Sequence, residues 1–103
     1  MTREFGHDAE RRRYTLHVDG ELVSTADYRI VGDDAIAFPH TVTMPAHRGN
    51  GYADLLVSFA MDHVEATSTR RVLPQCWFVA EWFAQHPERA DLLRRGGTAS
   101  AAP

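Results

Sequence analysis

The sequence contains very little cysteine and no lysine. Cys76 is the only thiol, so an internal disulfide is excluded, and such sparing use of cysteine is typical of proteins in a reducing cytoplasm. All 11 basic residues are arginine, which we attribute to the codon bias of a GC-rich genome. We therefore expect a cytoplasmic protein whose fold does not depend on disulfide bonds.

Long apolar runs and an excess of positive charge are also missing. No stretch approaches the roughly 20 apolar residues of a membrane span, and the charged start of the chain lacks the apolar core of a signal peptide. The formal net charge of -3 argues against a nucleic-acid surface. The 103 residues are enough for one small domain with a modest core. We therefore expect a single domain with no membrane and no nucleic acid among its partners.

The first half of the chain alternates between apolar and polar residues, as half-buried strands do. Residues 1–12 are polar and charged, and we expect them to form a flexible arm. Strands are predicted over residues 13–18, 21–31 and 35–44. Asp19-Gly20 is a strong signal for a two-residue hairpin between the first two strands. Pro39 predicts a bulge or an edge position in the third strand.

A turn with two glycines joins the third strand to a helix. The helix is predicted from Tyr52 to Glu65 by an apolar stripe made of Leu55, Leu56, Phe59, Ala60, His63 and Val64. Gly49 and Gly51 allow a ligand to approach the backbone closely. The start of the helix adds unpaired N–H groups and the positive end of the helix dipole. The turn is therefore predicted to be an anion site suited to a pyrophosphate.

The second half of the chain predicts one more strand and one more helix. The strand covers residues 70–73, and the helix covers residues 77–85 and stops at His86, because the residue before a proline avoids the helical region. Residues 94–103 are rich in small residues and are expected to form a flexible tail. The order β-β-β-α-β-α predicts an α/β (α+β) domain over residues 13–93. In it an antiparallel meander leads into a parallel strand pair, with the helices packed on the sheet.

This order, with Arg48-Gly49-Asn50-Gly51-Tyr52-Ala53 between third strand and first helix, resembles the GCN5-related N-acetyltransferase (GNAT) superfamily. Arg48, Gly51 and Ala53 fit the fixed positions of its cofactor motif, Q/R-x-x-G-x-G/A. Further matches to the small YjdJ-type N-acetyltransferase-like branch are His40-Thr41, Leu73-Pro74-Gln75-Cys76 and His86-Pro87-Glu88. The resemblance covers residues 14–93, which is nearly all of the part expected to be ordered.

The resemblance implies acetyl-CoA as the acyl donor. The pyrophosphate would be held by the backbone N–H groups of Arg48, Gly49, Asn50, Gly51, Tyr52 and Ala53. The pantetheine arm would pair with the strand backbone at Val42, Thr43 and Met44. The thioester would lie between the splayed ends of the third and fourth strands. This placement implies three residues near the reacting carbon, namely His40, Thr41 and Cys76.

Each of these side chains has a structural alternative. Cys76 lies at or just before a helix start, a position that lowers the pKa of a thiol. It could accept the acetyl group, or it could simply be a small buried apolar residue. His40 could act as a general base or could simply hydrogen-bond its strand neighbours. The other histidines lack the spacing of metal ligands, so we predict no metal site.

Two departures from the family pattern leave the function open. Larger GNAT enzymes have a helical wall between their first strands, whereas only Asp19-Gly20 connects them here. Many also use a tyrosine of the last helix to protonate the leaving thiolate, but no tyrosine follows Tyr52. The resemblance implies an N-acetyltransferase acting on a small-molecule or protein amine at an open site, which a partner or a homodimer could complete. The alternatives are a non-catalytic acyl-CoA-binding module and an interaction domain without a ligand.

Overall fold

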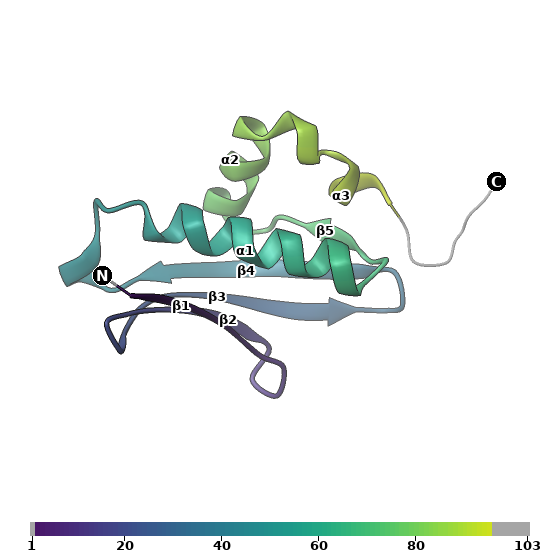
Figure 1. Ribbon diagram of the computed structural model, residues 1–103. Helices are drawn as coiled ribbons and strands as arrows, with labels where there is room; N and C mark the ends of the chain where they lie inside the picture. The colour runs from purple at the N-terminus through teal and green to yellow at the C-terminus, as the bar shows by residue number, and fades with distance from the viewer. Residues whose placement is uncertain (1, 96–103) are drawn as a thin grey trace.

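The computed structural model describes residues 2–95, in which five strands form one sheet and the helices pack against it (Figure 1). In chain order the elements are β1 (Arg3–Asp8), β2 (Arg13–Val18), β3 (Glu21–Val31), β4 (Ala35–Thr43), the 3-10 turn η1 (Pro45–His47), α1 (Tyr52–Thr67), β5 (Arg71–Leu73), α2 (Trp77–Gln85), the 3-10 turn η2 (Pro87–Arg89) and α3 (Asp91–Arg94). The strands lie in the order β1-β2-β3-β4-β5, with the first four antiparallel and β5 parallel to β4. The predicted α+β fold, a meander leading into a parallel pair, is confirmed.

The strand β1 corrects the prediction of a flexible arm over residues 1–12. β1 pairs with β2 along its whole length, and two of its side chains reach the helix layer. The ring of Phe5 stacks on Phe59 of α1 with centroids 4.9 Å apart, and the ring centroid of His7 lies 4.6 Å from that of His63. These contacts join residues more than 50 positions apart in the sequence. The segment itself is mostly polar, so its own residues do not indicate a strand. The prediction was therefore wrong for residues 3–8.

The core lies between the sheet and the helices. α1 buries Leu56, Ala60 and Val64 of the predicted stripe, whereas Leu55, Phe59 and His63 are half-buried and the stripe extends instead to Val57 and Met61. The helix continues two residues beyond the predicted end, to Thr67, where the Ser68 N–H donates to the Val64 carbonyl. α2 packs beside α1, and the indole N–H of its Trp82 donates to the Ser58 hydroxyl at 3.1 Å. The buried members of the core that come from the helices are Tyr52, Leu56, Val57, Ala60, Met61, Val64, Val79, Trp82, Phe83 and Leu92.

A bulge in β4 opens a gap between β4 and β5. Asp27 of β3 faces His40 and Arg29 faces Ala37, so β4 carries two residues where β3 has only Tyr28. One of the two is Pro39, which confirms the predicted bulge. β5 pairs only with the first three residues of β4, and the last bond across this edge runs from the Cys76 N–H to the Phe38 carbonyl at 2.9 Å. Beyond that point β4 has no neighbour on its β5 side within residues 2–95.

The end of the described chain is also held by hydrogen bonds to the rest of the fold. α3 extends to Arg94, and the Arg95 guanidinium donates to the carbonyls of Arg70 and Val64. The tail predicted from residue 94 is therefore ordered at its first two positions, and residues 96–103 lie outside the described residues. None of the helices in residues 2–95 has the length and apolar character needed to cross a membrane.

Candidate functional site

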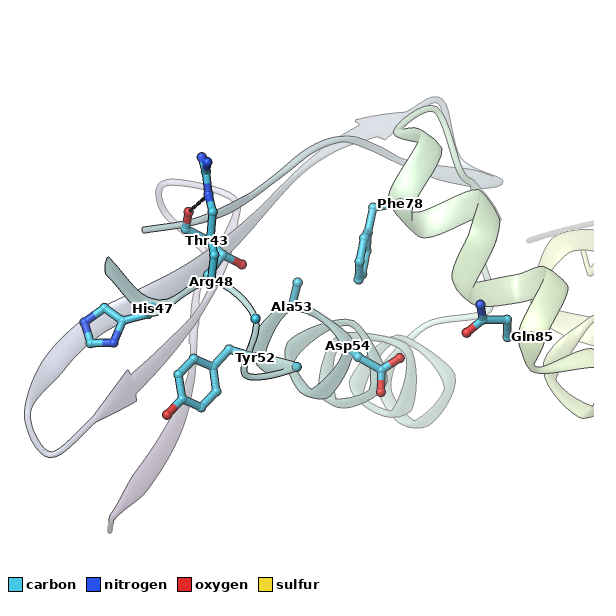
Figure 2. Close-up of a pocket in the computed structure, with 10 residues that line it drawn as sticks. Thr43, His47, Arg48, Tyr52, Ala53, Asp54, Phe78 and Gln85 are labelled. Atoms are coloured by element: carbon cyan, nitrogen blue, oxygen red, sulfur yellow. Dashed lines mark hydrogen bonds between the residues drawn. The ribbon is translucent and has the colours of Figure 1, made fainter. Parts of the chain in front are cut away.

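A pocket of 610 Å³ lies where the end of β4, the turn after it, the start of α1 and one side of α2 meet (Figure 2). Its lining residues are Thr43, His47, Arg48, Gly49, Gly51, Tyr52, Ala53, Asp54, Phe78 and Gln85. The lining includes every residue from Arg48 to Ala53, the segment that the sequence predicts to hold a pyrophosphate, except Asn50. The side-chain amide of Asn50 donates instead to the His47 carbonyl at 3.1 Å. The structure therefore gives the predicted anion site a cavity next to it.

The turn into α1 requires glycine at two positions. Gly49 and Gly51 have φ values of 86° and 76°, in the left-handed region that other residues avoid. Gly51 is the N-cap of α1 and offers no side chain to cap the helix. The first helical bond runs from the Leu55 N–H to the Gly51 carbonyl, so the amides of Ala53 and Asp54 precede it in the helix. These N–H groups and the helix dipole favour an anion here, although the Asp54 carboxylate on the pocket lining reduces the attraction.

Arg48 brings a full positive charge to the same end of the pocket. Its side chain is exposed and lies across the end of β4, where Nε donates to the Thr43 carbonyl at 3.4 Å (Figure 2). That bond is long, and within residues 2–95 no carboxylate lies within ion-pair distance of this guanidinium. The charge of Arg48 can therefore act on a bound phosphate.

The free edge of β4 presents peptide groups that point into the gap beside β5. The Met44 N–H donates to the Val23 carbonyl of β3 at 2.8 Å. Because peptide groups alternate in direction along an antiparallel pair, Val42 also faces β3, while Thr41 and Thr43 face the gap. Within Val42–Met44, the segment predicted to pair with a pantetheine arm, the N–H and C=O groups open to such a chain are therefore those of Thr43. The register could not be read from the sequence, because it depends on which bonds β3 and β4 exchange.

The three predicted catalytic residues do not all face the same way. Thr41 lies opposite Ala26 on the face of the sheet that α1 covers, and its Oγ1 is buried without a hydrogen-bond partner within residues 2–95. His40 is exposed and, by strand alternation, lies on the other face. Cys76 is half-buried at the N-cap of α2, as expected, with its backbone against Phe38. The structure thus brings Cys76 to β4 but separates the side chains of His40 and Thr41.

Four further pocket residues were not among the predicted binding residues. Phe78 projects from α2 toward Ala53 at the start of α1, and Gln85 lies at the other end of α2 (Figure 2). His47 lies beside Glu21, with Nε2 and Oε2 3.1 Å apart. The fourth is Asp54 in the first turn of α1. The apolar pattern of α2 gave a weak signal for Phe78, because a residue at the edge of an apolar stripe can line a cavity.

The face of the sheet that carries His40 has no helix on it within residues 2–95. The His40 side chain and that of Val42, which is 45% exposed, lie there in the open. This face is therefore open to a ligand beside the end of β4 in the described part of the chain. No group of three His, Cys, Asp or Glu side chains in the described part of the chain could hold a metal ion.

The sequence over residues 13–92 matches the family model described as GCN5-related N-acetyl-transferase. The chain belongs to this family. The glycine turn, the bulged β4 and the parallel β5 described above are therefore features of a GNAT domain. The family supports acyl-CoA-dependent N-acetyl transfer at a general level and leaves the acceptor unassigned.

Solved structures share this fold at low sequence identity. One is N-acetylglutamate synthase from Neisseria gonorrhoeae, complexed with coenzyme A and N-acetyl-glutamate, with 18% identity and a TM-score of 0.53. Another is ribosomal-protein-alanine N-acetyltransferase from Brucella melitensis, with 20% identity and a TM-score of 0.55. The similarity covers 82% and 88% of this chain but 24% and 69% of those chains. The comparison with curated protein sequences gives no match.

Proposed function

We propose that this GNAT domain binds acetyl-CoA in the pocket at the start of α1 and transfers the acetyl group to an amine. The observation that carries the proposal is the 610 Å³ pocket, which joins the anion-binding turn to the free edge of β4. The turn fits a pyrophosphate, because it combines glycine backbone, first-turn amides and the Arg48 guanidinium. The edge at Thr41 and Thr43 fits an extended amide-bearing chain, which can pair with a strand in the manner of β-augmentation.

The gap between β4 and β5 is where we place the reaction. The amine nitrogen attacks the thioester carbon and forms a tetrahedral intermediate; the C–S bond then breaks and CoA leaves as the thiolate. Backbone N–H groups at the free edge of β4, such as that of Thr41, would stabilise the oxyanion. A base must take a proton from the amine, and the exposed His40 imidazole is suited to this role on the open face.

Cys76 offers a second route through the same gap. Its thiolate would attack the thioester, release CoA and then pass the acetyl group from sulfur to the amine. Cys76 lies at the N-cap of α2, and half-burial of its side chain limits access to the sulfur. Placement in the YjdJ-type branch also remains a proposal, resting on the His40-Thr41 and Pro74-Gln75-Cys76 matches.

Acetyl-CoA binding tests the pocket itself. Gly51→Trp places an indole on the N-cap of α1, where it would occupy the phosphate position, and calorimetry on the variant should show loss of the micromolar binding expected of the wild type. The matched control is Gly20→Trp in the β2–β3 turn. Gly20 has a φ of 84°, and at Gly20, as at Gly51, an added Cβ would meet no atom within 4 Å, so the backbone strain of the two variants is similar. Equal affinity in Gly51→Trp and wild type would refute the assigned site.

A non-catalytic acyl-CoA-binding module is the second candidate. It is favoured by α2, where the aromatic residues Trp82 and Phe83 are buried and no tyrosine is available to protonate the leaving thiolate. Release of free CoA in the presence of an amine panel separates the two candidates. An enzyme should release CoA, and His40→Ala should slow the release roughly 100-fold, as expected for loss of a general base.

The control for His40 is His17→Ala, which removes a half-buried histidine from β2 of the same sheet and should leave CoA release unchanged. Cys76→Ala should abolish release if the acetyl group passes through sulfur, and intact-mass measurement of the wild type should then show an acetylated chain. CoA release that is absent with every amine, together with intact acetyl-CoA binding, would replace the enzyme by the binding module.

A further inference from the structure

A second pocket, of 520 Å³, lies at the far end of α1 from the proposed acetyl-CoA site. Its lining residues are Glu65, Ala66, Thr67, Ser68, Thr69, Arg70 and Arg95. α1 has 16 residues and therefore spans about 24 Å. Residues 52–54 at its start line the first pocket and residues 65–67 at its end line the second, so the length of the helix separates the two. Nothing in the proposed acetyl transfer uses this second pocket.

The arginines of this pocket differ from the other half-buried arginines in residues 2–95. Arg13, Arg71 and Arg89 each form an ion pair with at least one carboxylate. Arg70 and Arg95 are also half-buried, yet neither lies within ion-pair distance of a carboxylate in the described part of the chain. Partly buried charges are normally paired, because removing a charge from water is unfavourable without compensation. The Glu65 carboxylate and the negative end of the α1 dipole compensate these two guanidinium groups only in part. The buried Arg70 Nε has no partner in the described part of the chain, and an anion would accept its N–H.

The hydrogen bonds of the two guanidinium groups leave donors unused. Arg95 donates from Nε to the Arg70 carbonyl at 2.9 Å and from Nη2 to the Val64 carbonyl at 3.0 Å, which fixes its position at the end of α1. Arg70 donates only from Nη2, to the Gly32 carbonyl at a long 3.5 Å, and its Nε is buried without a partner within residues 2–95. A guanidinium has five N–H donors, so both residues retain capacity for an oxyanion. Burial lowers the pKa of Arg95, and the Glu65 carboxylate opposes this only in part.

Hydroxyl groups complete the lining of the pocket. The Ser68 Oγ accepts the Arg70 N–H at 3.0 Å, which leaves its own hydrogen free to donate to a ligand. Thr69 adds a second hydroxyl at the exposed rim. The only carboxylate in the lining is that of Glu65, and it accepts a bond from Arg89 at 3.1 Å. The pocket thus combines two positive charges and neutral donors with one carboxylate that is paired with Arg89, at the negative end of the α1 dipole. The positive charges and the donors are the groups that would hold a phosphate.

We propose that this pocket is a second anion site, which binds the phosphate group of a small phosphorylated molecule or inorganic phosphate. The volume exceeds what one phosphate needs, so a phosphate monoester with a small organic group also fits. An anion held there would connect the end of α1 with the residue before β5 and the residue after α3. Such a ligand would stabilise the folded chain, because it binds only when these three segments are together.

The test is an NMR titration of the full chain with inorganic phosphate, and in a second arm with glycerol phosphate, against sodium chloride of equal ionic strength. The amide signals of Ser68, Thr69 and Arg70 should shift saturably with phosphate, separately from any shift at residues 49–53 near the first pocket. Arg70→Gln and Arg95→Gln should abolish the shifts at 68–70. Equal affinity for the two ligands assigns free phosphate, and tighter binding of the ester assigns a phosphate monoester.

The matched control is Arg94→Gln, which removes an exposed arginine next to the site that pairs with Asp91 and should leave the titration unchanged. Because Arg95 also bonds the end of α1, Arg95→Lys is a second variant, which keeps the positive charge but lacks the two parallel N–H donors of a guanidinium. It should bind phosphate roughly fivefold more weakly. Shifts confined to residues 49–53, identical shifts with chloride, or full binding in a folded Arg70→Gln protein would overturn the proposal.

Discussion

At the scale of single residues, Thr41 combines an unfavourable position for folding with a favourable one for chemistry. Its hydroxyl is buried without a hydrogen-bond partner in the described part of the chain, and its backbone faces the gap beside β5. A buried hydroxyl without a partner is destabilising, because it loses water and gains nothing in return. Residues of this kind often mark functional sites, where a ligand supplies the missing partner.

Thr41→Val tests this interpretation, since valine has nearly the same shape but no hydroxyl. We expect the free energy of unfolding to stay level or rise by about 1 kcal/mol in urea denaturation, while CoA release falls. Ser24→Ala is the comparison, because the Ser24 hydroxyl donates to the Val42 carbonyl at 2.9 Å and its removal should destabilise the fold by about 1 kcal/mol. A Thr41→Val protein that is less stable than the Ser24→Ala protein would contradict the assignment.

At the scale of elements, β1 is held to the sheet by an aromatic cluster that contains two histidines. His7 stacks on Tyr14 and its Nε2 lies 2.6 Å from the Tyr28 hydroxyl, while the Tyr14 hydroxyl lies 2.8 Å from His63 Nδ1. Burial and the nearby His63 lower the pKa of His7, and the Asp8 carboxylate opposes them. Burial likewise raises the pKa of Tyr14 and that of Tyr28. The cluster therefore favours a neutral His7.

The stability of β1 should depend on pH in a direction set by this shift. A histidine with a lowered pKa in the folded state binds protons more readily when unfolded, so stability is full above pH 6.5 and declines as the pH falls through the folded-state pKa. The urea midpoint of the wild type should therefore fall between about pH 7.5 and about pH 5. His7→Phe keeps a ring on Tyr14 and should show a smaller fall; an unchanged slope in this variant would remove His7 as the cause.

The same cluster shows why β1 was not predicted from the sequence. Only Phe5 and His7 of its six residues make these ring contacts, and their partners Phe59 and His63 lie in α1. The other strands and α2 carry enough apolar residues at the right spacing to be recognised from their own sequence. The predicted bounds of β2, β3 and α2 therefore agree with the structure. The glycine turn could also be predicted from the sequence, because the positive φ values of Gly49 and Gly51 are a local backbone requirement.

At the scale of the whole molecule, this chain is a GNAT domain with one face of its sheet uncovered in residues 2–95. The order of the elements from β2 to α2 and the parallel crossover followed from sequence patterns, whereas β1 and α3 did not. The split of His40 and Thr41 between the two faces follows from strand alternation and could have been stated beforehand. The assignment of Thr41 and Thr43 to the free edge could not, because it depends on the hydrogen bonds between β3 and β4.

The uncovered face also bears on the acceptor. The N-acetylglutamate synthase and ribosomal-protein-alanine N-acetyltransferase chains are longer than the part this chain matches. A face without a helical wall admits an extended or bulky amine, such as a protein terminus, as readily as a small molecule. A partner or a second copy of the chain could also cover it. The proposals on the acceptor and on a homodimer therefore concern the same surface.

The bulge in β4 means that the gap beside β5 is encoded by the number of residues rather than by their kind. β4 places Phe38 and Pro39 opposite the single Tyr28, and this mismatch directs the rest of the strand away from β5. Substitutions at these positions leave the count unchanged, whereas removal of one residue would restore an even ladder and let the strands continue side by side. The gap is therefore less sensitive to a substitution at the half-buried Pro39 than to a one-codon deletion, whereas Phe38 is a fully buried core residue whose truncation would destabilise the fold.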